Sequence, residues 1–171
     1  MSLAATVLGQ FPADQPVYAV LDGARDSRIR GFVFDTRAPK WCLYRGRLTP
    51  ELEDAAPWLL SLSREHPATE IFFKRFWGQA CGILLATPMP GPLLRRHLRR
   101  FLLARDPRGR TLLFRYYDPR VLRIYLPTLT EAEAAQFFGE ISAFVAEGAE
   151  RGEFHLFQRA GAQVEERRIA A

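Results

Sequence analysis

Short runs of apolar residues, each ended by a turn signal, are the most regular feature of this chain. The runs at 17–21, 41–44 and 81–87 stop near glycine or proline and have the length of buried strands. The stretches at 27–36 and 66–77 place apolar side chains three or four residues apart, which predicts short helices. This alternation predicts an α/β domain with a mixed β-sheet flanked by helices.

The helical pattern is clearest at residues 91–105. Its apolar positions form one stripe, made of Leu94, Leu98, Phe101 and Leu102. The opposite face carries four arginines, Arg95, Arg96, Arg99 and Arg100. We interpret these four arginines as a candidate partner-binding surface, because such a helix buries its apolar stripe and exposes its basic face.

The region near the C-terminus predicts a pair of adjacent strands. Residues 140–147 alternate apolar side chains with other types, residues 154–157 are extended, and a glycine-containing turn joins them. This arrangement predicts a C-terminal antiparallel β-hairpin. Residues 50–62, in contrast, combine helical and strand-like features around Pro57, so the pattern leaves their structure open.

The ends of the chain differ from its centre. Residues 1–16 are punctuated by prolines, and the last residues are polar. We therefore expect a loose N-terminal arm at 1–16, a single α/β domain at 17–158 and a polar C-terminal tail at 159–171. A chain of 171 residues with 48% hydrophobic content is long enough for one domain with a buried core.

The segment from 111 to 122 joins a predicted strand to a predicted helix. Residues 111–117 are apolar or aromatic on both faces except at Arg115, which is typical of a strand covered on two sides. Asp118 is suited to cap the following helix, and Pro119 to occupy its first position. A charged side chain in an apolar strand is costly unless paired, so we expect Arg115 to pair with Asp22 or Asp118.

Two further signals follow that helix. A leucine and a proline at 126–127 end it, and Thr130 and Glu133 have the spacing of a capping box. Gly139 comes directly after two phenylalanines and is suited to end this second short helix.

The order LLFRYYDPRVL, a leucine–proline pair and a capped helix that ends in FFG resembles the bacterial type VI secretion effector chaperone (adaptor) family. The strand and aspartate–glycine turn at 17–25, the glycine-containing strand at 80–85 and the leucine–histidine–arginine helix at 94–99 are also similar to that family. The resemblance covers about residues 17–140. Its motif residues here are Asp22, Gly23, Arg115, Tyr116, Asp118, Pro119 and Arg120.

The resemblance implies an adaptor that is not an enzyme. Such a protein would bind a toxin effector and help to load it onto the VgrG spike, with the effector and VgrG as its partners and no cofactor. No apolar run approaches the roughly 18 residues of a membrane span, and the N-terminus lacks a signal-peptide pattern. We therefore expect a cytoplasmic protein without a membrane partner.

The arginine face admits three interpretations. Ten arginines but only two acidic residues lie between Arg95 and Arg123, so this part of the chain is strongly basic. It could be a solvated surface, a docking surface for an acidic protein, or a phosphate-binding surface in a nucleic-acid-binding module that uses helix 91–105. Nucleic acid is the less favoured partner, because no groove-reading motif accompanies the arginines.

Side chains with catalytic or metal-binding chemistry are few and scattered. The histidines at 66, 97 and 155 have no ligand neighbour at helical spacing, and Cys42 and Cys81 form no CxxC pair. We expect no metal site. Asp22 and Asp118 each follow a predicted strand and are the carboxylates that a small enzyme would use, but a turn at Asp22 and a helix cap at Asp118 explain them better.

Overall fold

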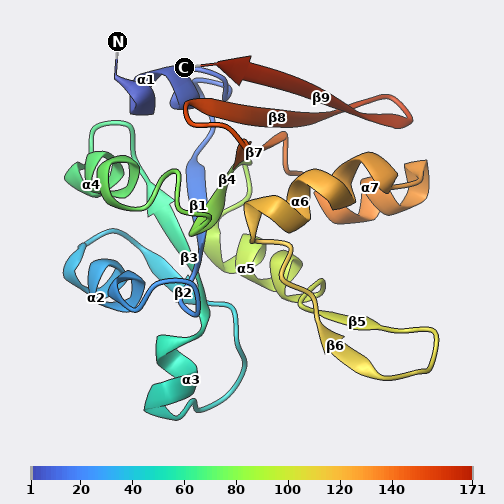
Figure 1. Cartoon of the computed structure of the whole chain (residues 1–171), viewed down its shortest axis with the longest axis horizontal. Helices are drawn as coiled ribbons and strands as arrows, with labels where there is room; N and C mark the ends of the chain where they lie inside the picture. Colours follow the sequence, from blue (N-terminus) through green and yellow to red (C-terminus); the bar gives the residue numbers. More distant parts are fainter. Residues whose placement is uncertain (1, 171) are drawn as a thin grey trace.

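The computed structural model describes residues 2–170 and builds them around a seven-stranded sheet (Figure 1). In sequence order its strands are β1 (Val17–Asp22), β2 (Lys40–Cys42), β3 (Pro57–Leu62), β4 (Gly82–Ala86), β7 (Ala143–Glu147), β8 (Glu153–Ala160) and β9 (Gln163–Ala170). They lie in the order β2-β3-β1-β4-β7-β8-β9, and each neighbouring pair is antiparallel. The α/β class is confirmed, with antiparallel pairing where a mixed sheet was predicted. The hydrophobic pattern of a strand does not depend on its direction, so the pattern could not distinguish an antiparallel sheet from a mixed one.

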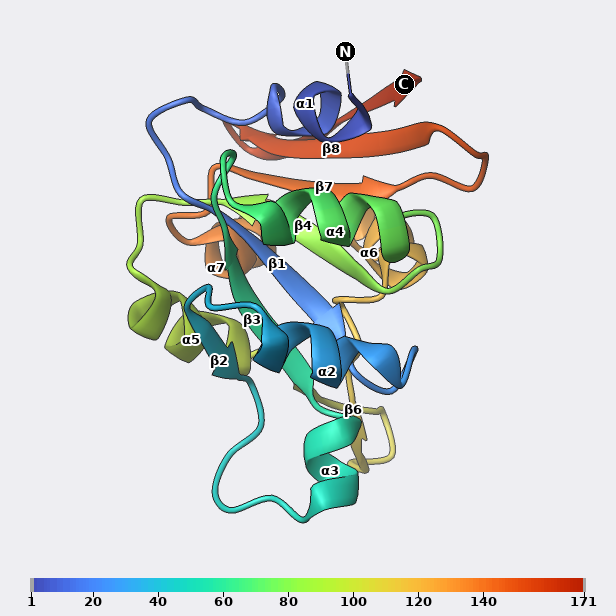
Figure 2. The same cartoon turned by 90° about the vertical axis from the view of Figure 1, so that its left-hand side faces the viewer.

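Helices cover both faces of the sheet (Figures 1 and 2). One face packs against α1 (Leu3–Leu8), α2 (Arg28–Asp35) and α4 (Pro67–Arg75). The other packs against α5 (Gly91–Arg99), α6 (Pro119–Tyr125), the 3₁₀ helix η1 (Leu126–Thr128) and α7 (Glu131–Phe138). The sheet is therefore the middle layer of three.

Strand β1 shows why its sequence is an unbroken apolar run. Val17, Ala19 and Leu21 belong to the core on one side of the sheet, and Tyr18 and Val20 to the core on the other. Successive side chains of a strand point to opposite faces, so a strand in the middle layer needs apolar residues at every position. The run at 81–87 behaves in the same way as β4, which is buried throughout.

Several predicted elements are present close to their predicted bounds. The helices at 27–36 and 66–77 are α2 and α4, and the C-terminal hairpin is formed by β7 and β8. The region left open at 50–62 contains the short helix α3 (Pro50–Asp54) and then β3. Pro57 is the first residue of β3, a position where a proline is compatible with a strand.

The predicted helix at 91–105 and strand at 111–117 are each too long. The helix ends at Arg99, and residues Leu103–Arg105 (β5) pair with Thr111–Leu113 (β6) in a separate hairpin that projects from the domain (Figure 1). Both strands of this hairpin are exposed, so the prediction of a strand covered on two sides is wrong for 111–113. Tyr116 and Tyr117 are buried as expected, but they lie in the turn after the hairpin.

The two ends of the chain are more structured than the sequence predicted. In the segment expected to be a loose arm, α1 buries Ala4, Val7 and Leu8 against the core, because these residues lie on one helical face. In the segment expected to be a polar tail, β9 pairs with β8 along its whole length at the edge of the sheet. An edge strand tolerates charged residues on both faces, so its sequence resembles a tail.

Candidate partner-binding surface

The aspartate–glycine turn closes the end of β1 by close backbone contact. A Cβ atom on Gly23 would lie 2.4 Å from the carbonyl oxygen of Asp54 and 2.6 Å from that of Ala56. Only glycine fits at this position, because both neighbours are backbone atoms that side-chain movement cannot relieve. The Asp22 carboxylate is buried and accepts a hydrogen bond from the backbone N–H of Ala24 at 3.1 Å.

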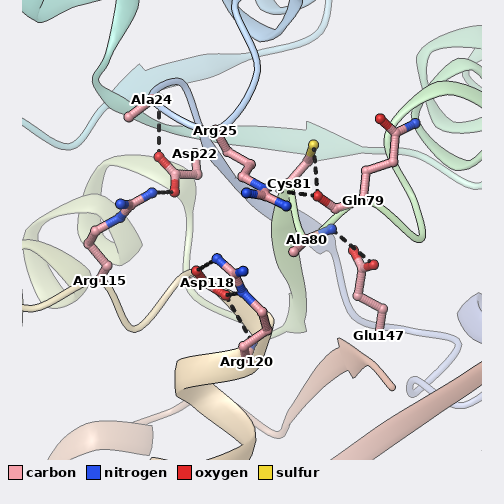
Figure 3. Close-up of polar contacts among 10 residues, drawn as sticks. All are labelled: Asp22, Ala24, Arg25, Gln79, Ala80, Cys81, Arg115, Asp118, Arg120 and Glu147. Atoms are coloured by element: carbon pink, nitrogen blue, oxygen red, sulfur yellow. Dashed lines mark hydrogen bonds and ion pairs between the residues drawn. The ribbon is translucent and has the colours of Figure 1, made fainter. Parts of the chain in front are cut away.

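Arg115 is the cationic partner of the Asp22 carboxylate (Figure 3). Its guanidinium donates a hydrogen bond to the Asp22 carboxylate and forms an ion pair with it, as predicted. The Asp22 side chain is 1% exposed and the Arg115 side chain 39% exposed. The pair therefore joins the end of β1 to the segment that follows the projecting hairpin, ninety-three residues away in sequence.

Asp118 begins α6 as the sequence predicted. Its carboxylate accepts a hydrogen bond from the backbone N–H of Arg120 at 2.9 Å and a bidentate pair from the Arg120 guanidinium at 2.9 and 2.6 Å. Pro119 occupies the first helical position. Burial raises the pKa of Asp118, but the hydrogen bonds from Arg120 outweigh burial and leave this pKa below its usual value.

Tyr116 connects this motif to α5. Its ring is fully buried, and its hydroxyl donates a hydrogen bond to the carbonyl of Leu98 at 3.1 Å, in the last turn of α5. The same carbonyl also accepts a hydrogen bond from the backbone N–H of Phe101 at 3.2 Å, so the tyrosine adds a second donor at the end of α5. The motif residues thus hold α5 in place as well as the end of the sheet.

Two close contacts fix the other parts of α5. At its start, a Cβ atom on Gly91 would lie 2.1 Å from the Trp41 ring, so only glycine lets the helix approach β2 this closely. Near its end, the Nε2 atom of His97 lies 2.8 Å from the carbonyl oxygen of Phe137 in α7. The pKa of His97 is lowered because burial disfavours the charged ring.

The four predicted arginines divide into two kinds. Arg95 and Arg99 are half-buried, whereas Arg96 and Arg100 are exposed. The Nε of Arg95 donates a hydrogen bond to the carbonyl of Cys42 at 2.7 Å and so ties α5 to β2. The Nε of Arg99 is buried and has no hydrogen-bond partner among residues 2–170.

Arg45, which sequence reasoning missed, completes this surface. It lies just after β2 and lines a hollow of about 500 Å³ together with Arg95, Arg96 and Arg99. Only the packing of α5 on β2 brings it there, and no local pattern signals that packing. We call Arg45, Arg95, Arg96, Arg99 and Arg100 the arginine cluster.

The arginine cluster has no internal counter-charge. None of its members forms an ion pair with a carboxylate of residues 2–170. Six other arginines pair with an aspartate or a glutamate: Arg28, Arg30, Arg110, Arg115, Arg120 and Arg168. The remaining arginines of residues 2–170 form no ion pair, so the cluster differs from them in bringing five such arginines together. The pKa of Arg99 is lowered by burial and, to a smaller extent, by the charges of Arg95 and Arg45. Such a surface is suited to bind carboxylates or phosphates, which match the planar guanidinium group.

Among residues 2–170, no group of three or more histidine, cysteine, aspartate or glutamate side chains could hold a metal ion. No helix in that part of the chain is long and apolar enough to cross a membrane. The carboxylates of Asp22 and Asp118, which a catalytic alternative would use, are both engaged by arginines and backbone N–H groups.

Fold and surface together define an α/β domain with an ion-pair motif at the end of β1 and the start of α6, and with a basic surface on α5. A family model described as "Domain of unknown function (DUF4123)" matches residues 17–136, which is more than half of the chain. The chain therefore belongs to the DUF4123 family. No curated protein and no solved structure matched it.

Proposed function

We propose that this protein is an adaptor that binds a toxin effector of a type VI secretion system and helps to load it onto the VgrG spike. In this role the protein recognises a partner in the cytoplasm and catalyses no reaction. Membership of the DUF4123 family and the resemblance of its motif to effector chaperones support this role.

The observation that carries the proposal is the unpaired arginine cluster held in place by the motif. Tyr116 and the Arg115–Asp22 pair fix the segment after the hairpin, and Tyr116 in turn holds α5. The arginines of α5 are then presented without a carboxylate of residues 2–170 to neutralise them. An acidic partner would gain charge complementarity there, which speeds association and selects against basic partners.

The proposal is tested by co-expressing the protein with the effector encoded beside its gene and purifying one of them through a tag. We expect a stable complex and reduced secretion of the effector when the adaptor gene is deleted. An effector that does not co-purify and is secreted normally from the deletion strain would contradict the proposal.

The same charges also support a second candidate, a nucleic-acid-binding module that uses α5. A cluster of arginines without counter-charges attracts phosphate groups regardless of their source. Tyr116 and Tyr117 are buried, however, so neither can stack on an exposed base. Retention of an oligonucleotide that weakens steeply with salt, with no affinity for the effector, would favour this second candidate.

A further inference from the structure

The projecting hairpin exposes two leucines that face the same way. Leu103 in β5 and Leu113 in β6 lie directly opposite each other and are 63% and 45% exposed. Paired residues of adjacent strands point to the same face, so these side chains form one apolar patch. Covering this patch with apolar side chains of a partner would remove apolar surface from water, which is favourable.

This patch forms one wall of a groove beside the arginine cluster. The groove has a volume of about 400 Å³, and the buried side chains of Leu43 and Leu102 contribute to its apolar lining. Arg45, Arg99 and Arg100 also line it. We call this feature the hairpin groove. It places an apolar wall beside three guanidinium groups that form no ion pair within residues 2–170.

Arg99 lines this groove and has a hydrogen-bond donor that is not used. Its Nε is removed from solvent and donates to no acceptor among residues 2–170. A buried donor without a partner is destabilising, and a hydrogen bond to a charged acceptor is stronger than one to a neutral acceptor. The Nε itself is closed to solvent, so a carboxylate in the groove would pair with the guanidinium atoms of Arg99 that line it, which no carboxylate of residues 2–170 neutralises.

We infer that the hairpin groove binds a segment of the effector that carries large apolar side chains next to aspartate or glutamate. The apolar side chains cover Leu103 and Leu113, and the carboxylates pair with Arg45 and Arg99. This inference rests on the proposed function, because it names the chemistry of the effector segment and the part of the surface that receives it.

The lining of the groove favours a protein segment over a nucleic acid. Four leucines line it, with Tyr44 as its one aromatic residue. Surfaces that bind single-stranded nucleic acid combine basic residues with several aromatic side chains on which bases stack. An aliphatic wall instead matches leucine-like side chains, which gain free energy when they leave water.

The test compares two groove variants with two matched controls in binding the purified effector. The groove variants are Leu103→Asp with Leu113→Asp, and Arg45→Glu with Arg99→Gln. The first control is Leu112→Asp. Leu112 lies in the same hairpin and is 49% exposed, but its side chain is on the opposite face from Leu113. The second control is Arg159→Glu, an exposed arginine in β8.

We expect each groove variant to bind the effector at least about tenfold more weakly, and each control to stay within about twofold of the original protein. Thermal melts of each variant separate lost binding from lost folding. Because Leu103 and Leu113 are exposed, their variants should remain folded even if the Arg99 variant does not.

The outcomes distinguish the inference from the proposed function. If the original protein binds no effector, the proposed function fails and the inference fails with it. If the complex forms and the folded groove variants bind as well as the controls do, the inference is overturned while the adaptor function stands. If the groove variants lose affinity only for a single-stranded oligonucleotide, the groove serves nucleic acid and the inference is wrong.

Discussion

At the scale of single residues, the buried carboxylate of Asp22 is the centre of the motif. It has one guanidinium partner, Arg115, in the segment after the β5–β6 hairpin, and one backbone donor, Ala24, in the turn after β1. A buried carboxylate that loses its cationic partner is strongly destabilising, more so than the pair itself is stabilising. Arg115 is therefore the residue whose removal should reveal the role of the motif.

Replacing Arg115 with methionine should lower the free energy of unfolding by about 3 kcal/mol. Loss of one member of a buried pair costs about 3–5 kcal/mol, and the lower end applies because Arg115 is 39% exposed. Arg28→Met is the control, since Arg28 pairs with Asp26 at the surface and its loss should change the free energy of unfolding far less. Urea unfolding curves measure both values.

The same variant separates a structural role of Arg115 from a role in recognition. We expect Arg115→Met to lose effector binding only as far as it loses folded protein. A normally stable variant that cannot bind would instead place Arg115 within the binding surface.

Glu147 gives a prediction about pH. It is buried at the end of β7 and accepts a hydrogen bond from the N–H of Ala80 at 3.1 Å (Figure 3). Burial raises its pKa to about 7, well above its value in an unfolded chain. At a pH between the ordinary pKa of 4.5 and about 7, Glu147 holds a proton in the folded protein that it has released in the unfolded chain. This group therefore makes the free energy of unfolding fall as the pH rises toward 7.

Glu147→Gln lacks this titration. We expect the variant to gain stability relative to the original protein as the pH rises from about 5 to about 8, by up to the order of 3 kcal/mol. Glu150→Gln, an exposed change in the turn that follows β7, should show no such trend. Urea unfolding at several pH values decides the matter, and parallel stability curves for Glu147→Gln and the original protein would contradict the raised pKa.

At the scale of elements, helix α6 begins at Asp118 and Pro119, as the sequence predicts. Asp118 caps the helix, and its loss leaves the N–H of Arg120 without its side-chain acceptor. Asp118→Ala should therefore lower the free energy of unfolding by about 0.5–2 kcal/mol. Asp118→Asn keeps the capping oxygen and should cost less. Equal stability of Asp118→Ala and the original protein in urea melts would show that the cap contributes nothing.

Elements with a strong local signal could be predicted from the sequence. The cap of α6, the capping box of α7 at Thr130 and Glu133, and the apolar run of β1 each arise from residues close in sequence. A pairing of Arg115 with Asp22 or Asp118 could also be predicted, because a charge in an apolar segment demands a partner, but the sequence did not distinguish the two carboxylates.

Elements that depend on distant packing could not be predicted in the same way. The hairpin of β5 and β6 is exposed on both strands, so hydrophobic pattern assigned one strand to a helix and the other to a buried sheet. Arg45 joins the arginine cluster only because Gly91 lets α5 approach Trp41. No short-range pattern encodes the approach of α5 to β2. This approach decides the shape of the candidate site.

At the scale of the whole molecule, the packed sheet and helices differ from the exposed basic surface. The sheet and its two helical layers bury Asp22, Tyr116 and Asp118, whereas the arginine cluster and the hairpin groove lie at the surface. Charge attraction should then influence association more than folding. We expect the association rate with the effector to fall as salt concentration rises, while the melting temperature changes little.

The most direct test of the binding surface is charge reversal at Arg96 and Arg100. Both side chains are exposed and form no ion pair within residues 2–170, so Arg96→Glu with Arg100→Glu should leave folding intact. The measurement is the dissociation constant for the purified effector at low and at high salt. The account predicts affinity at least about tenfold weaker at low salt, and a smaller difference at high salt. Unchanged affinity of a folded variant at both salt concentrations would contradict the claim that the arginine cluster binds the partner.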